Sequence, residues 1–319
     1  MEKKYELVKE SVINEEYSGV NLYRIRALRD FGDVKKGDLG GFVEKEDNLS
    51  HNGNCWIYRD AKVYNNARVS DNAIVSDKVE VYGNAGVYGN AKICNYVEVC
   101  DNVEVCGDAE LFDNSRIYGD ARIYGNASVS DNVKIYGKTN ISGDCWISGN
   151  ARVHGDAEVF GNAEVYDCAE VFSKSTVCGR ANIHDEALIF GNCIIEDAEI
   201  CENAYISGNV KISNGAKIGR DAIIDSSQKY ITIGPIDDSD GITFYLSATK
   251  FLFVMHEYLH KDGYKGGIDG FIDYIDKEVD EKYKNVYLAA VNLAKAKLLS
   301  IPELKIPSTV DIEDAFNDN

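Results

Sequence analysis

The 319-residue sequence predicts a mostly β protein in which short strands coil into a parallel β-helix. A six-residue repeat runs over residues 55–225, its last two positions are rich in Gly, Asn and Asp, and the chain has 28 Gly but only 3 Pro. The predicted domains are an N-terminal β cap at 1–48, the repeat β-helix at 49–225, a C-terminal α+β domain at 226–302 and an acidic tail at 303–319.

The N-terminal segment is predicted to cover the first coil, because an exposed strand edge invites aggregation. It contains two predicted strands, Tyr5–Lys9 and Leu22–Phe31, and a Gly-rich stretch at Lys35–Gly41. These elements predict a β cap.

Each hexad alternates small, polar, branched and variable side chains before its corner. The third position is Val or Ile from Ile57 to Ile224, with Leu111 the single Leu, and the first position is small. This period of two predicts a strand whose first and third side chains point inward. Gly, Asn and Asp tolerate positive φ at the corner. The five-residue unit Cys193–Asp197 predicts a local corner defect.

The C-terminal segment loses the repeat after Ser226. Alternating and β-branched residues predict strands at Tyr230–Pro235, Thr243–Ser247 and Phe251–Tyr258. Apolar stripes at helical spacing predict helices at Ile268–Val279 and Val286–Leu299.

The sequence resembles hexapeptide-repeat proteins of prophages and gut bacteria, which are often labelled acetyltransferases. The resemblance rests on the hexads and on Ile25–Phe31, Val34–Gly41, Asn48–His51, Cys55–Tyr58, Ile231–Pro235, Thr243–Tyr245, Tyr287–Ala290 and Leu293–Lys295. It implies a left-handed, three-sided β-helix with ~18 residues per coil, hence about 9.5 coils. It also implies a phage-like setting, and it transfers no catalytic residue.

The charge balance is strongly acidic, with 34 Lys and Arg against 53 Asp and Glu. A net charge of −19 argues against direct nucleic-acid binding and against anionic membranes. The acidity has two open explanations, nucleic-acid mimicry and the need for Asp at corners. The sequence has no apolar run long enough for a membrane span and no secretory signal, so we expect the cytoplasm of a bacterial host.

The candidate contact face is the outward fourth position of the hexads on one side. Its ring-bearing members, which Cys100 interrupts, are Tyr64, Tyr82, Tyr118, Tyr136, His154, Phe172 and Phe190. These rings stack to stabilise neighbouring strands, or they form an exposed face for self-association as a trimer or dimer or for another partner. Trp56 and Trp146 are also predicted to point outward.

Candidate catalytic and metal-binding residues are few. His154 and His184 follow inward residues and are predicted to be exposed. His51 is the better candidate for a general base, and the favoured alternative for it is a structural role in capping the first coil. The segment His256–His260 matches the zinc motif H-E-x-x-H, which needs a helix, but its surroundings favour strands. The nine Cys show no CxxC spacing and are expected to be reduced thiols. We therefore predict no metal, no cofactor and no catalytic residue.

Two functions follow from these features. The first is a non-catalytic binding or scaffold protein of phage type, including an anti-defence factor that sequesters a host protein or a nucleotide signal. The alternative is a hexapeptide-type acyltransferase that uses acetyl-CoA.

Overall fold

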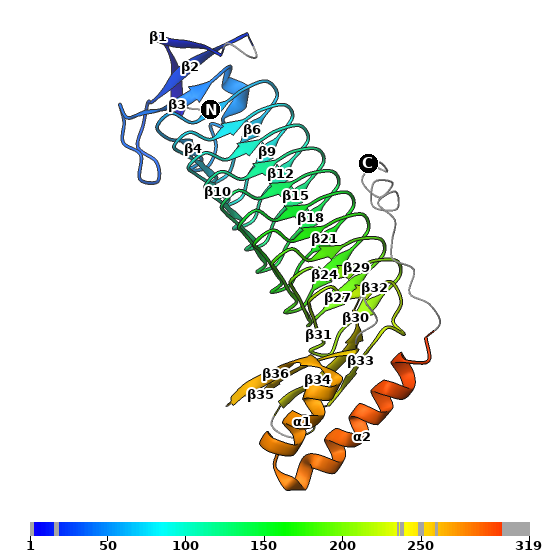
Figure 1. The fold of residues 1–319 in the computed structure, drawn as a ribbon. Helices are drawn as coiled ribbons and strands as arrows, with labels where there is room; N and C mark the ends of the chain where they lie inside the picture. Colours follow the sequence, from blue (N-terminus) through cyan, green and yellow to red (C-terminus); the bar gives the residue numbers. More distant parts are fainter. Residues whose placement is uncertain are drawn as a thin grey trace. The chain divides into compact units, whose positions relative to one another are not determined.

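The computed structural model describes residues 3–15, 19–234, 236, 239–247, 252–258 and 261–301. It is mostly β, with about ten turns of a parallel β-solenoid and a small C-terminal antiparallel sheet with two helices (Figure 1). The chain divides into two compact units, Met1–Gly161 and Asn162–Asn319.

The solenoid of the first unit has three sides, each a ladder of parallel two-residue strands. One side, here called the ring side, is formed by β5 (Lys62–Val63), β8 (Glu80–Val81), β11 (Glu98–Val99), β14 (Arg116–Ile117), β17 (Lys134–Ile135) and β20 (Arg152–Val153). The second side is formed by β4 (Trp56–Ile57), β7 (Ile74–Val75), β10 (Lys92–Ile93), β13 (Glu110–Leu111), β16 (Ser128–Val129) and β19 (Trp146–Ile147). The third is formed by β6 (Arg68–Val69), β9 (Gly86–Val87), β12 (Glu104–Val105), β15 (Arg122–Ile123), β18 (Asn140–Ile141) and β21 (Glu158–Val159).

The interior of each coil is filled by the first and third hexad positions. Val63 pairs with Val81 and Val81 pairs with Val99, so these residues stack on one wall at successive levels, as predicted. All three are fully buried. A column of stacked Val and Ile removes apolar surface from water at every level, which accounts for the invariance of the third position along the repeat.

Asp side chains at the corners have a structural role. Asp71, Asp101 and Asp131 adopt positive φ, and each carboxylate accepts the backbone N–H of the corner one coil further on, at 3.0, 3.0 and 2.9 Å. Asn side chains form a similar ladder from Asn66 to Asn84 and on to Asn102. Corner geometry therefore accounts for the presence of these acidic residues.

The N-terminal cap consists of β1 (Tyr5–Glu15), β2 (Val20–Ala27), β3 (Leu39–Val43) and the 3-10 helix η1 (Glu46–Asn48). Strands β1, β2 and β3 are antiparallel, and β3 then pairs in parallel with β5. Gly40 lies where a Cβ would come within 2.6 Å of Ile57 O, so the Gly-rich stretch allows the cap to approach the first coil.

The cap changes the environment of the first coil. Trp56 is 1% exposed because Tyr5 and Phe31 cover its ring, with centroid distances of 6.2 and 5.3 Å. The predicted outward direction of Trp56 therefore does not leave it exposed, whereas Trp146 is 42% exposed. The buried Lys4 ammonium also joins the cap to the coil by donating to Cys55 O at 2.9 Å.

The solenoid of the second unit continues the three-sided pattern. Its sides are formed by β22 (Glu164–Val165), β25 (Asn182–Ile183), β28 (Glu199–Ile200) and β31 (Lys217–Ile218); by β23 (Glu170–Val171), β26 (Leu188–Ile189), β29 (Tyr205–Ile206) and β32 (Ile223–Ile224); and by β24 (Thr176–Cys178), β27 (Ile194–Glu196) and β30 (Lys211–Ile212). At the five-residue unit the corner is shortened. Asp197 takes positive φ and its carboxylate accepts Arg180 N–H at 2.8 Å, so strand pairing continues with one residue fewer.

The C-terminal part of the second unit is an antiparallel sheet of β33 (Tyr230–Ile233), β34 (Ser239–Leu246), β35 (Leu252–Tyr258) and β36 (Lys261–Gly267), with helices α1 (Ile268–Glu278) and α2 (Glu281–Leu298) (Figure 1). Its core includes Phe244, Val254, Phe271 and Tyr287. Thr243 accepts Lys217 N–H at 3.0 Å, which attaches the sheet to the last coil.

Several predicted elements differ from those observed. Strand β36 was missed, and α2 begins at Glu281 because Asp280 caps it by accepting Lys282 N–H. His256 lies on β35, within the predicted strand Phe251–Tyr258, so the helix that the zinc motif requires does not form there. His260 and the predicted acidic tail lie outside the described residues. Among the helices that the structure describes, none has the length and apolar character needed to cross a bilayer.

Candidate binding face

The ring side of the first unit carries an interrupted ladder of stacked rings. Tyr64 and Tyr82 stack with centroids 5.1 Å apart, and Tyr118 and Tyr136 stack at 4.9 Å. Tyr136 then stacks on His154 at 4.5 Å, with ring planes only 3° apart. Parallel, in-register strands place the fourth positions directly above one another, so the rings meet face to face. The rings therefore stack on one another, which is the first of the two explanations that the sequence left open.

The stack buries more of its members than expected. Tyr64 is 5% exposed because it packs with Leu22 and Phe42 of the cap. His154 is 1% exposed, so its predicted exposure was wrong, and its position against Tyr136 explains the burial. Tyr82, Tyr118 and Tyr136 are half-buried.

Two further ring residues belong to the second unit. Phe172 is fully buried and stacks on Phe190 at 5.0 Å. Phe190 is half-buried and meets the edge of Tyr205 at 4.9 Å. Phe172 therefore serves packing within its unit rather than an exposed face.

The ladder is interrupted at Cys100. Strand β11 lies between β8 and β14, so Cys100 occupies the level between Tyr82 and Tyr118. Two ladder steps of ~4.8 Å separate those rings by roughly 10 Å, which is twice the spacing of the stacked pairs. A small thiol thus stands where a ring would complete the stack, and one face of Tyr118 lacks a ladder neighbour.

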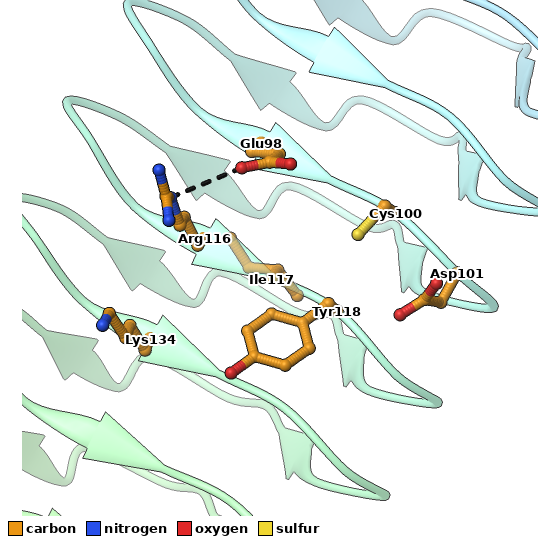
Figure 2. Close-up of a pocket in the computed structure, with 7 residues that line it drawn as sticks. All are labelled: Glu98, Cys100, Asp101, Arg116, Ile117, Tyr118 and Lys134. Carbon is orange, nitrogen blue, oxygen red and sulfur yellow. Dashed lines mark ion pairs between the residues drawn. The ribbon is translucent and has the colours of Figure 1, made fainter. Parts of the chain in front are cut away.

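A depression of about 240 Å³ lies at this interruption (Figure 2). It is lined by Glu98, Cys100, Asp101, Arg116, Ile117, Tyr118 and Lys134. Figure 2 shows the Glu98–Arg116 pair at the start of the strands, and Cys100 and Asp101 beyond their ends. The depression is neither enclosed nor flat, so a flat group can enter it and lie against the ladder.

Charge along this side changes from mixed to basic. Lys62 pairs with Glu80 at 2.9 Å, and Glu98 accepts a hydrogen bond from the Tyr82 hydroxyl and pairs with Arg116 at 3.4 Å. Beyond them, the second hexad positions are basic at three successive levels, Arg116, Lys134 and Arg152. A cationic strip of this kind favours an anionic ligand.

The titratable groups at the depression do not favour nucleophilic catalysis. Burial raises the pKa of the Cys100 thiol, so it stays protonated at neutral pH and is a weak nucleophile. Burial also raises the pKa of the Tyr118 hydroxyl. The side chains around the depression can stack on a flat ring, form hydrogen bonds and neutralise negative charge.

His51, the best catalytic candidate from the sequence, lies in the cap region. Its ring lies against Tyr5 with centroids 4.5 Å apart and planes tilted by 30°, and its Nδ1 accepts Lys4 N–H at 3.2 Å. Burial lowers its pKa, and Glu46, 3.8 Å from Nε2, opposes that shift. These contacts give His51 a structural role in joining the cap to the coil.

His184 lies in a cluster that the sequence analysis missed. It is only partly exposed, and its side-chain donors approach those of Glu199 and Cys201 to within 4.8 Å. The signal was available in the fourth hexad positions, where Cys201 follows His184 at a step of 17 residues instead of 18. Short metal-binding motifs in a sequence do not include ligands 17 residues apart.

Comparisons with known proteins agree with the repeat architecture. A family model described as the YdcK β-solenoid repeat matches residues 61–77 and 115–131. The chain resembles hexapeptide-repeat β-helix proteins that carry an acetyltransferase label. Over 39 residues it is 49% identical to "Uncharacterized acetyltransferase YdcK" of Escherichia coli K12, a match that spans 12% of this chain and 12% of that protein. The likeness therefore concerns the repeat, and the activity named for YdcK is not transferred by it.

Proposed function

We propose that this chain is a non-catalytic binding protein that holds a planar aromatic anion, of the nucleotide class, at the interrupted ring ladder. The observation that carries the proposal is the absence of one ring at Cys100, between Tyr82 and Tyr118, in a ladder whose neighbouring rings stack at 4.9 to 5.1 Å. A flat ring inserted at this level restores the spacing of the stack.

Stacking supplies the first part of the binding energy. Aromatic stacking on a base is worth ~1–3 kcal/mol, and it tolerates different bases because each has a flat π face. Tyr118 is held in place by Tyr136, with ring planes 1° apart, so little side-chain freedom is lost when a ligand ring stacks on it.

The adjacent cations supply the second part. Arg116 and Lys134 line the depression, and the Arg116 side chain is 63% exposed. A guanidinium has five N–H donors, so Arg116 can hold a phosphate while keeping its contact with Glu98. Because these groups are exposed, we expect moderate affinity that falls as salt rises. Binding without turnover fits a protein that sequesters a nucleotide.

Cys100→Tyr should abolish this binding, because the new ring completes the ladder and occupies the site. The control is Cys94→Tyr, which adds a ring in the same coil between Ser76 and Phe112, where no Tyr pair flanks it. Isothermal titration with AMP, GMP, CMP and UMP should show binding to the wild type and to Cys94→Tyr, with at least ~10-fold loss for Cys100→Tyr. Equal affinity in all three proteins, or no binding of any mononucleotide at about 1 mM, would contradict the proposal.

The acyltransferase alternative draws on the name of the E. coli relative. Coenzyme A also carries an adenine ring and phosphates, so its binding alone does not separate the two functions. Release of free thiol from acetyl-CoA, measured in the presence of candidate amine and hydroxyl acceptors, separates the two functions. Enzymatic release that disappears in His51→Ala would favour the acyltransferase, whereas binding of coenzyme A without release supports sequestration.

A further inference from the structure

We infer that the second unit contains a binding site for a divalent metal ion of the zinc class, formed by His184, Glu199 and Cys201. The three residues come from adjacent ladder levels. Asn182 pairs with Glu199 and Ile183 with Ile200, so the imidazole of His184 lies one level from the side chains of Glu199 and Cys201. Their donor atoms all lie within 4.8 Å of one another.

The donor set matches the chemistry of zinc. Nitrogen, oxygen and sulfur ligands from His, Glu and Cys hold Zn²⁺ at about 2.0 to 2.3 Å, usually with tetrahedral geometry. Three protein ligands leave the fourth position to water. The soft thiolate disfavours Mg²⁺ and Ca²⁺, which prefer oxygen ligands. On binding, the Cys201 thiol proton passes to solvent and the sulfur coordinates as thiolate.

The orientation of His184 supports ligation through Nε2. Its Nδ1 lies 3.1 Å from Asp185 Oδ2, and that same oxygen accepts Glu202 N–H at 2.9 Å, which fixes the carboxylate. A metal-bound imidazole typically donates its other N–H to a carboxylate, and Asp185 lies within reach of Nδ1 for that role. Nε2 lies 3.4 Å from Glu199 Oε1, which is close to the separation of two ligand atoms that share one tetrahedral Zn²⁺ at about 2.0 to 2.1 Å.

The two oxygens of Glu199 have different neighbours. Oε1 faces His184, while Oε2 pairs with the Lys217 ammonium at 3.1 Å. Lys217 therefore holds the carboxylate through the oxygen that points away from the imidazole, and Oε1 is the one available to a metal. The Tyr166 ring, stacked on His184 at 5.0 Å, restricts rotation of the imidazole.

Gly219 gives an independent indication of space kept beside the thiol. It follows Cys201 at the next level, and a Cβ there would lie 3.0 Å from Cys201 Sγ. Its φ lies outside the left-handed region, so backbone conformation does not require glycine here. Glycine instead leaves the sulfur free of a Cβ contact on the side of the following level.

Cobalt provides the test, because a tetrahedral Co²⁺–thiolate site absorbs in the near ultraviolet and the visible. The reduced full-length chain, freed of metal with a chelator, is titrated with Co²⁺ and then with Zn²⁺. We expect about one equivalent of Co²⁺ to give a thiolate-to-cobalt band that Zn²⁺ removes. Absence of that band overturns the inference.

Variants assign the ligands. Cys201→Ser should remove the thiolate band and His184→Gln should weaken Co²⁺ binding at least ~100-fold, whereas Asp185→Asn should weaken it by ~10–100-fold through the orientation of His184. Cys94→Ser is the matched control, since Cys94 holds the equivalent hexad position after β10 and its substitution should leave the spectrum unchanged.

Circular dichroism verifies that each variant is folded. A band that survives Cys201→Ser, or that Cys94→Ser also removes, overturns the assignment. Mononucleotide binding in the first unit is measured separately, so either proposal can fail alone.

Discussion

Ile141→Asp should destabilise the solenoid by more than about 4 kcal/mol, enough to abolish a folded first unit at 37 °C. Ile141 lies on β18 and is fully buried. It pairs with Ile123 below and Val159 above, so a carboxylate there would have aliphatic neighbours on both levels. A charge without a partner in such an interior costs several kcal/mol, in addition to the lost apolar burial.

Ser142→Asp is the matched control, because Ser142 is the next residue and points outward. Its new carboxylate stays hydrated, so the free energy of unfolding should change by less than about 1 kcal/mol. Thermal unfolding followed by circular dichroism compares the two variants with the wild type. If Ile141→Asp unfolded at the same temperature as Ser142→Asp, the inward position of the third hexad residue would be wrong. The assignment of the ring side would then be wrong as well.

Gly125→Ala should destabilise the same unit by roughly 2 kcal/mol or more. Gly125 occupies a corner at φ +74°, where an L side chain is strained. Its Cβ would also lie 2.8 Å from Gly143 N and 3.1 Å from Gly143 O, and these backbone atoms cannot move aside without disturbing the corner of the next coil.

Gly86→Ala provides the comparison, since Gly86 lies within β9 and its added Cβ would meet only the Tyr88 ring, at 3.6 Å. A glycine replaced without strain typically gains ~0.4–1 kcal/mol by restricting the unfolded chain. Urea denaturation should therefore separate the variants, with the midpoint lowered for Gly125→Ala and unchanged or raised for Gly86→Ala. Equal midpoints would show that corner geometry does not limit stability.

The repeat was predictable because its information is local. The alternation of Lys62, Val63 and Tyr64 fixes which side chains point inward, and the corner residues fix where each strand ends. Repetition every 18 residues then stacks Val63, Val81 and Val99 on one wall. The interruption of the ring ladder at Cys100 can likewise be read from the sequence once the coil length is known.

Exposure was less predictable, because it depends on elements distant in sequence. Alternation places Trp56 and Tyr64 on the outside of a coil, but the cap residues Phe31 and Leu22 cover them. His154 was expected to be exposed but is buried, with its ring stacked on Tyr136. An outward direction is a property of one strand, whereas burial depends on everything packed against it.

By itself the sequence determined the inward column, the corners and the order of the rings, since each depends on residues within one hexad or on an 18-residue step. Only the tertiary structure decided which rings are covered and that His184, Glu199 and Cys201 converge. The physical reason is that a five-residue unit shifts the spacing to 17, and that cap and sheet contacts join segments whose proximity no local pattern encodes.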